Sequence, residues 1–273
     1  MPVFFDTNVI RYLSVGLRNP LPDHSRNLVR LSPISATELI SQIATQPQAA
    51  LGVVHSFDKW LNPDHAILLE WHESFYADRV FGVQFEDAAS EHLAAAVTRC
   101  FEMTEVSDDV IEDAQELRQF LVAAKRSKAQ LLERAVRRIR DLRVEADELT
   151  AGARRAIAAG LAERIGALLG TWTEEDVAAQ LGAYFEFHTD LVVRAVPALD
   201  FNFFSPDHLN DHFDAEQLCY LADPCLHFVT CDLGYTRVRH AEQRNRIHVL
   251  SAQDLQDPHL APSIISHILS DAT

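Results

Sequence analysis

The sequence contains no apolar run long enough to cross a membrane. A transmembrane helix needs roughly 18 to 20 consecutive apolar residues, and no stretch of the 273 residues approaches that length. The opening segment, residues 1–5, lacks the basic start of a signal peptide, and an acid follows directly at Asp6. These absences predict a cytoplasmic protein with no membrane partner.

Cysteine is also scarce, with four in the chain. Cys219, Cys225 and Cys231 follow one another at intervals of six residues, whereas paired zinc ligands are usually separated by about two to four. We therefore expect the cysteines to be reduced and buried. His72-Glu73 begins like a zinc-protease motif, but the position of the second histidine is occupied by Tyr76.

Several catalytic signatures are missing. The chain has no glycine-rich dinucleotide loop, no Gly-Lys-Ser/Thr phosphate loop and no Gly-x-Ser-x-Gly elbow. A haloacid-dehalogenase-type phosphatase would start with a strand-end aspartate such as Asp6. It would also need a second aspartate two residues later, where this chain has Asn8, so this phosphatase class is disfavoured.

What the chain has in excess is negative charge, with a formal net charge of −16. Such a charge repels nucleic acid at long range. Between Arg118 and Arg164, however, twelve Lys or Arg residues face six Asp or Glu residues. This segment could bind RNA phosphates, dock an acidic protein, or form a solvated helix face with internal ion pairs. The residues we assign to RNA are Lys125, Arg126, Lys128, Arg134, Arg137 and Arg138.

Short apolar strands are predicted at both ends of the chain, at residues 3–5, 28–31, 226–230 and 247–250. Helices are predicted after three of them, and a turn after the strand at 226–230, which is the pattern of an α/β fold with a parallel sheet. The middle of the chain is almost entirely helical in pattern, with one long apolar stripe over 110–142. We therefore predict a split α/β domain, residues 1–55 and 207–273, interrupted by a large all-helical insertion at 56–206.

Four acids stand at the starts of predicted helices or turns, and each has an ordinary structural explanation. Asp6 could cap the first helix, and Glu38 could complete a capping box with Ser35. Asp214 lies in a first helical turn, where the helix dipole favours an acid. Asp232 follows a strand in a turn, where aspartate is common. Considered singly, none of them requires a function.

Their common placement favours a function. In an open parallel sheet, ligands bind beyond the carboxyl ends of the strands, and helices that follow strands begin at the same edge. Asp6, Glu38, Asp214 and Asp232 should therefore converge. Crowded carboxylates repel one another and their pKa values rise, unless a hard divalent cation with oxygen ligands lies between them.

These segments resemble the PIN-domain ribonucleases. Phe4-Phe5-Asp6-Thr7-Asn8 is similar to the first family motif, and Ser35-Ala36-Thr37-Glu38-Leu39 to the second. Asp214 and the run Val229-Thr230-Cys231-Asp232 match the third and fourth acids. The resemblance covers residues 1–55 and 207–256, and about 175 residues separate the second acid from the third, many more than in small PIN toxins.

The resemblance implies a PIN-like α/β/α fold and an endoribonuclease that uses Mg²⁺ or Mn²⁺. Asp6, Glu38, Asp214 and Asp232 would be both the catalytic residues and the metal ligands, supported by Asn8 and Thr230. The products would carry a 5′-phosphate and a 3′-hydroxyl, and a toxin–antitoxin setting would add a cognate inhibitor protein.

Two alternatives stay open. Asp207 and Asp211 compete with Asp214 for the third position, with Asp211 placed as the helix N-cap. The whole chain could instead be a catalytically idle PIN-like scaffold that binds RNA or a protein.

Overall fold

The computed structural model describes residues 1–62, 68–85, 93, 95–99, 105–142, 146–167, 171–205 and 208–271. Its centre is a parallel sheet of four strands: β1 (Val3–Phe5), β2 (Val29–Leu31), β3 (His227–Thr230) and β4 (Ile247–Val249). The strand order is β2-β1-β3-β4. The predicted α/β class and all four predicted strands are confirmed.

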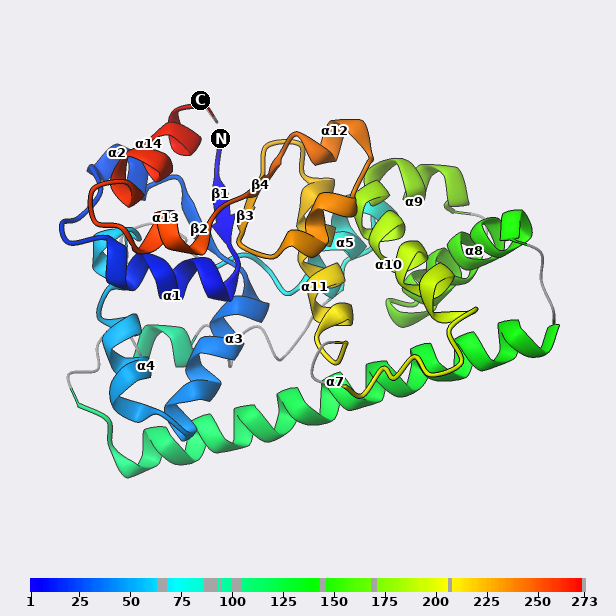
Figure 1. The fold of residues 1–273 in the computed structure, drawn as a ribbon, viewed down its shortest axis with the longest axis horizontal. Coiled ribbons are helices and arrows are strands. Elements are labelled where there is room, and N and C mark those ends of the chain that lie inside the picture. Colours follow the sequence, from blue (N-terminus) through cyan, green and yellow to red (C-terminus); the bar gives the residue numbers. More distant parts are fainter. Residues whose placement is uncertain are drawn as a thin grey trace.

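One face of the sheet is covered by helices from the two ends of the chain (Figure 1). Val3, Phe5 and Val229 point into this core because alternate residues of a strand face opposite sides. The helices are α1 (Thr7–Gly16), α3 (Pro33–Ser41), α4 (Pro47–Val54), α13 (Ala252–Gln256) and α14 (Ala261–Asp271).

The opposite face is covered mainly by helices from the middle of the chain, together with η3 from its C-terminal part. Phe4 and Phe228 stack with ring centroids 4.8 Å apart and pack into a second core. Its helices are α5 (His72–Phe81), α8 (Ala146–Arg164), α9 (Glu174–Gln180), α10 (Gly182–Ala195) and η3 (Leu218–Ala222). The sheet and the helices on its two faces make three layers, and the middle segment supplies most of one of them. The division of the chain into a domain and an insertion at residues 55 and 206 stays a prediction.

A single helix, α7 (Asp108–Leu142), runs for 35 residues along one edge of the molecule (Figure 1). The first half of the predicted apolar stripe is confirmed as the packing face, with Ala114 and Leu121 buried. In the second half Leu131 and Ala135 of the predicted stripe are exposed, and Ala129 and Val136 are buried in their place. α7 contacts α3, η1 (Gln42–Ala44) and α11 (Asp211–Gln217). It therefore lies against the two helices that carry Glu38 and Asp214.

Shorter elements complete the fold. Ser251 caps α13 by accepting from the Asp254 N–H, and Thr173 caps α9 by accepting from the Asp176 N–H. Leu31 forms an isolated parallel bridge with Leu68. The remaining elements are α2 (Asp23–Arg26), η2 (Phe57–Lys59), η4 (Leu233–Arg237) and α12 (Ala241–Arg244).

The structure also bears on the sequence-based expectations about membrane spans and cysteines. None of the helices in the described ranges is long and apolar enough to span a bilayer. Of the cysteines that the structure describes, Cys219, Cys225 and Cys231 are all free thiols. The expectation that they are buried holds for Cys219 but is wrong for Cys225, which is exposed in the turn before β3, and for half-buried Cys231.

Candidate metal-dependent active site

Asp6 and Asp232 follow β1 and β3, the two strands at which the chain order of the sheet reverses. From β1 the chain moves outward to β2, and from β3 it moves the other way to β4. β1 and β3 are hydrogen-bonded neighbours, with Phe5 opposite Val229, and the Asp6 N–H extends this ladder by donating to Val229 O at 3.0 Å. Ligands of open parallel sheets bind beside this switch point.

Thr230 links the two aspartates. Its hydroxyl donates to Asp6 Oδ2 at 3.0 Å and accepts from the Asp232 N–H at 3.0 Å. Asp6 occupies the N-cap position of α1, yet its side chain makes no capping hydrogen bond. Capping therefore does not explain the Asp6 carboxylate, whereas Asp232 does cap η4 by accepting from the Gly234 N–H at 2.6 Å.

Glu38 lies in the second turn of α3, so the capping-box explanation is wrong. The N-cap is Ser32, whose side chain accepts from the Ser35 N–H, because the Pro33 ring suits the first helical position. Ser35 instead donates its hydroxyl to Phe5 O at 3.0 Å. Glu38 accepts from the Thr7 hydroxyl at 2.6 Å and pairs with the Lys125 ammonium at 2.7 Å.

Asp214, and not Asp211, faces the other three acids. Asp211 is the first residue of α11 and not its N-cap, which is Asn210. Its carboxylate lies 2.9 Å from His208 Nδ1. Asp214 sits one turn later, and its backbone carbonyl accepts from the Tyr235 hydroxyl at 2.9 Å. Asp207 falls outside the described residues.

All four acids line one pocket of about 360 Å³, within the size range of small-ligand sites. Asn8 also lines it and is exposed. The pocket is also lined by further polar residues to which the sequence motifs assign no role. These are Thr7, Arg11, Ser41, Gln42, Arg118 and Asn210.

The pocket is electrostatically strained without a cation. Burial, together with the nearby Glu38 and Asp232 carboxylates, raises the pKa of Asp6 from 3.8 to about 6 despite the hydrogen bond from Thr230. Burial followed by repulsion from Asp6 and Glu38 holds the pKa of Asp214 well above its ordinary value. This is the behaviour expected of buried carboxylates that share a site.

The donor set suits a hard divalent cation, which prefers carboxylate and hydroxyl oxygens. The carboxylates are nevertheless spread out: no three of them bring one oxygen each to within 4.8 Å of one another. Mg²⁺ commonly keeps several waters and binds one or two carboxylates directly. The spread arrangement therefore fits ions with mixed carboxylate and water shells better than a closed cage of carboxylates.

The basic residues assigned to RNA are distributed along α7, and only Lys125 reaches the pocket. Exposed Arg126 lines an adjoining groove together with Arg118. Further along the helix, Lys128 pairs with Glu216 at 3.2 Å, and Arg137 pairs with Glu133 at 2.9 Å. The other two, Arg134 and Arg138, are exposed and do not line the pocket.

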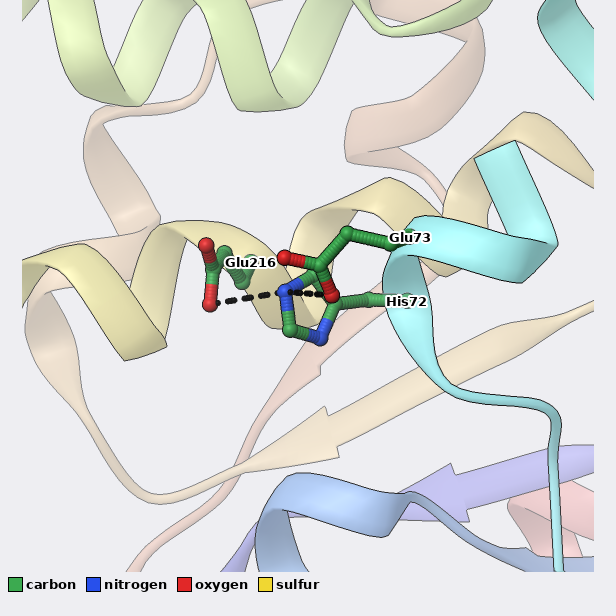
Figure 2. Close-up of side chains that lie close together, drawn as sticks. All are labelled: His72, Glu73 and Glu216. Carbon is green, nitrogen blue, oxygen red and sulfur yellow. Dashed lines mark ion pairs between the residues drawn. The ribbon is translucent and has the colours of Figure 1, made fainter. Parts of the chain in front are cut away.

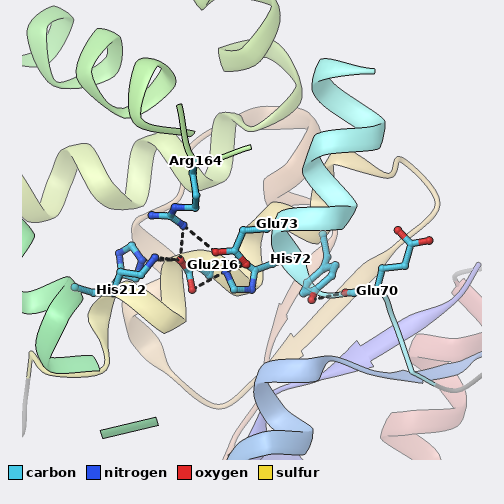
Figure 3. Close-up of polar contacts among 8 residues, drawn as sticks. Glu70, His72, Glu73, Arg164, His212 and Glu216 are labelled. Carbon is cyan, nitrogen blue, oxygen red and sulfur yellow. Dashed lines mark hydrogen bonds and ion pairs between the residues drawn. The ribbon is translucent and has the colours of Figure 1, made fainter. Parts of the chain in front are cut away.

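A second polar cluster lies behind the pocket, between α5, α8 and α11. Buried His72 places its Nε2 atom 2.7 Å from Glu73 Oε2 and 3.0 Å from Glu216 Oε2 (Figure 2). Arg164 reaches both carboxylates, at 3.1 Å and 3.3 Å, and His212 Nε2 lies 2.6 Å from Glu216 (Figure 3). The cluster fixes α11, two residues beyond Asp214.

The His72–Glu73–Glu216 geometry could accommodate a metal, but its two carboxylates already face cationic side chains. Arg164 and Lys128 both pair with Glu216, and a divalent ion would add two further positive charges to a buried site. In the sequence, His72 and Glu73 form only an incomplete zinc-protease motif. The missing partner is Glu216, which no local spacing could reveal.

Comparison of this chain with family models, with curated proteins and with solved structures gives no match. Its function must therefore be argued from the four-carboxylate pocket itself.

Proposed function

We propose that this chain is a PIN-like, metal-dependent endoribonuclease that hydrolyses RNA phosphodiester bonds. The observation that carries the proposal is the pocket at the switch point of the sheet. Asp6, Glu38, Asp214 and Asp232 come from four distant segments and line the same cavity. The raised pKa values of Asp6 and Asp214 support a site built for a cation.

In this proposal the four carboxylates hold Mg²⁺ or Mn²⁺. When bound, the metal would lower the pKa of water and stabilise charge on the phosphate oxygens. Thr230 orients Asp6 and Thr7 orients Glu38, through hydrogen bonds of 3.0 Å and 2.6 Å. Hydrolysis would add water across the P–O3′ bond and leave a 5′-phosphate and a 3′-hydroxyl.

The substrate needs cationic contacts because the body of the protein is acidic. Arg11 from α1, and Arg118 and Lys125 from α7, line the pocket beside the acids. Exposed Arg118 also lines the next groove along α7, together with Arg126. We therefore place the incoming RNA strand along this part of α7, with its scissile phosphate at the acids.

The direct test is cleavage of end-labelled single-stranded RNA with Mn²⁺, with Mg²⁺ and with EDTA. Wild type is compared with Asp214→Asn and with the matched control Asp211→Asn, three residues earlier on the same helix. We expect metal-dependent cleavage that is lost in Asp214→Asn and kept in Asp211→Asn. Equal cleavage by wild type and Asp214→Asn would contradict the proposed centre.

A second candidate function is favoured by one contact. The Lys125 ammonium forms an ion pair with Glu38. This pairing would also suit a catalytically idle PIN-like scaffold whose site no longer binds metal. Calorimetric titration with Mn²⁺ separates the two: heat of binding that disappears in Asp6→Asn supports the nuclease, and its absence in wild type supports the scaffold. A toxin-type role with an inhibitor protein would apply only to the active form.

A further inference from the structure

A second cavity lies between α7, α8 and α10, on the far side of α11 from the four acids. Its volume is about 440 Å³, within the size range of small-ligand sites. The walls are mostly aliphatic, and the side along α8 is open to solvent. The wall residues include Leu131, Leu132, Ile139, Ile157, Leu161 and Val192.

One end of this groove is polar and incompletely satisfied. His188 Nε2 and His212 Nδ1 are buried and have no hydrogen-bond partner among the described residues. The two rings pack edge to face at 5.1 Å, and both line the groove. A buried polar atom without a partner costs about 1 to 3 kcal/mol, so two in one place suggest that a ligand group completes them.

The same end carries cations. Lys128 and Arg164 line the groove. Lys128 lies 3.2 Å from Glu216, and Arg164 lies 3.3 Å from the same carboxylate (Figure 3). Burial lowers the pKa of His72, but the adjacent Glu216 and Glu73 carboxylates outweigh burial and raise it to about 9. With His72 protonated, three positive groups face two carboxylates, which leaves one positive charge for an anion to balance.

A glycine keeps the groove open. Gly160 lies inside α8, where glycine costs about 1 kcal/mol relative to alanine. A Cβ atom built on Gly160 would meet nothing within 4 Å. No steric contact of the described fold therefore requires glycine here, whereas a larger side chain would fill the groove that Gly160 lines.

We propose that this groove binds an amphipathic carboxylic acid with an aliphatic chain. The chain lies between α7 and α8 against the leucine and isoleucine side chains. The carboxylate lies at the closed end, where it accepts from His188 Nε2–H and pairs with Lys128 and Arg164. Glu163, at the solvent-exposed rim, disfavours the reverse orientation. None of the four acids lines this groove, so the proposal does not rest on nuclease activity.

The test is calorimetric titration of the whole protein with decanoate, with decanol and with acetate. We expect decanoate to bind with a Kd below about 1 mM, and decanol and acetate to bind at least tenfold more weakly. Decanol binding as tightly as decanoate would overturn the proposal, because the polar end would then contribute nothing. The absence of decanoate binding would overturn it as well.

Two variants locate the ligand. Gly160→Leu should weaken decanoate binding roughly tenfold or more by filling the groove, whereas Gly152→Leu, on the same helix but outside the groove, should leave it unchanged. His188→Phe should raise the thermal midpoint of the free protein, since it removes an unpartnered nitrogen, yet weaken decanoate binding. Unchanged binding in either Gly160→Leu or His188→Phe, with the fold verified by circular dichroism, would overturn the assignment.

Discussion

The ammonium group of Lys125 on α7 lies 2.7 Å from Oε1 of Glu38 on α3, although the two residues are 87 positions apart in the sequence. The same ammonium sits 5.5 Å from the ring centroid of Phe213, and the other Glu38 oxygen accepts from Thr7. Both oxygens of this carboxylate are therefore engaged in the metal-free protein. α7 thus contributes a charge to the pocket as well as a wall.

Replacing Lys125 should strengthen metal binding. In Lys125→Met the aliphatic part of the side chain is kept, one positive charge leaves the pocket and Glu38 Oε1 is released. We expect the affinity for Mn²⁺, measured by calorimetry, to rise about tenfold, since removal of a close like charge is worth roughly 1 to 2 kcal/mol. Arg126→Met, the exposed neighbour on α7, is the control and should change little. Weaker metal binding in Lys125→Met would show that Lys125 supports the site.

Asp6→Asn should stabilise the metal-free protein while abolishing metal-dependent cleavage. The pKa of Asp6 rises from 3.8 to about 6 on folding, which corresponds to roughly 3 kcal/mol at pH 7. The unfolded chain loses this proton first, so stability falls as pH rises from about 4 to about 6 and then stays level. Asp6→Asn should flatten this part of the profile.

The measurement is urea unfolding in EDTA at several pH values, with exposed Glu112→Gln on α7 as the control. A wild-type stability that does not change between about pH 4 and pH 6 would contradict the assigned environment of Asp6.

Arg118→Ala should weaken RNA binding without changing metal affinity. Arg118 lines the acid pocket and the adjoining groove, where a phosphate would follow the scissile one. On an Asp6→Asn background, which cannot cut, fluorescence anisotropy should show several-fold weaker binding and a salt dependence reduced by about one phosphate contact. Arg138→Ala, exposed and outside the pocket, should have no such effect. Equal losses in both variants would indicate a diffuse electrostatic role.

Glu216→Gln should destabilise the fold severely. Glu216 is 1 % exposed and faces His72, Lys128, Arg164 and His212. Removing its charge takes from Lys128 its carboxylate partner and leaves His72 and Arg164 with Glu73 alone. Breaking a buried ion pair typically costs about 3 to 5 kcal/mol. Chemical denaturation measures this loss in the free energy of unfolding. The control is Glu133→Gln, which breaks the exposed pair with Arg137 and should cost less than about 1 kcal/mol. A small loss in Glu216→Gln would mean that water reaches the cluster.

Gly16→Ala should also destabilise the protein, because a Cβ atom there would overlap the Leu255 carbonyl oxygen. α1 and α13 would have to separate, at a cost of about 1 to 3 kcal/mol. Gly52→Ala, inside α4 with nothing within 4 Å of its Cβ position, should instead stabilise by up to about 1 kcal/mol. Thermal unfolding of the two variants should shift in opposite directions; shifts of the same sign would contradict this packing.

The strands and the acids could be predicted because their signals are local. Val3–Phe5 and His227–Thr230 are short apolar runs followed by an acid, and parallel strands share an edge, so Asp6 and Asp232 had to lie close together. The start of α3 was misplaced because Ser35 and Ser32 are equally good caps in sequence. Ser35 is held instead by Phe5 O, a partner thirty residues away.

What the sequence could not reveal depends on tertiary contacts of long range. Lys125 meets Glu38 across 87 positions, and Lys128 meets Glu216 across 88. Both lysines belong to the same basic stretch, and its local excess of positive charge assigns them equally to RNA. Only the rotation of α7 against α3 and α11 directs Lys125 to the pocket and Lys128 to the buried cluster.

The central position of β1 has a consequence for synthesis on the ribosome. β1 is synthesised well before its partner β3, because about 220 residues separate Phe5 from His227. At typical translation speeds of about 5 to 20 residues per second, that interval lasts roughly 10 to 45 s. During this interval the edge of Val3–Phe5 that later pairs with β3 has no strand beside it, and an unpaired apolar strand edge promotes aggregation. The four acids cannot assemble either, so the proposed nuclease centre would not form on the nascent chain before β3 is made.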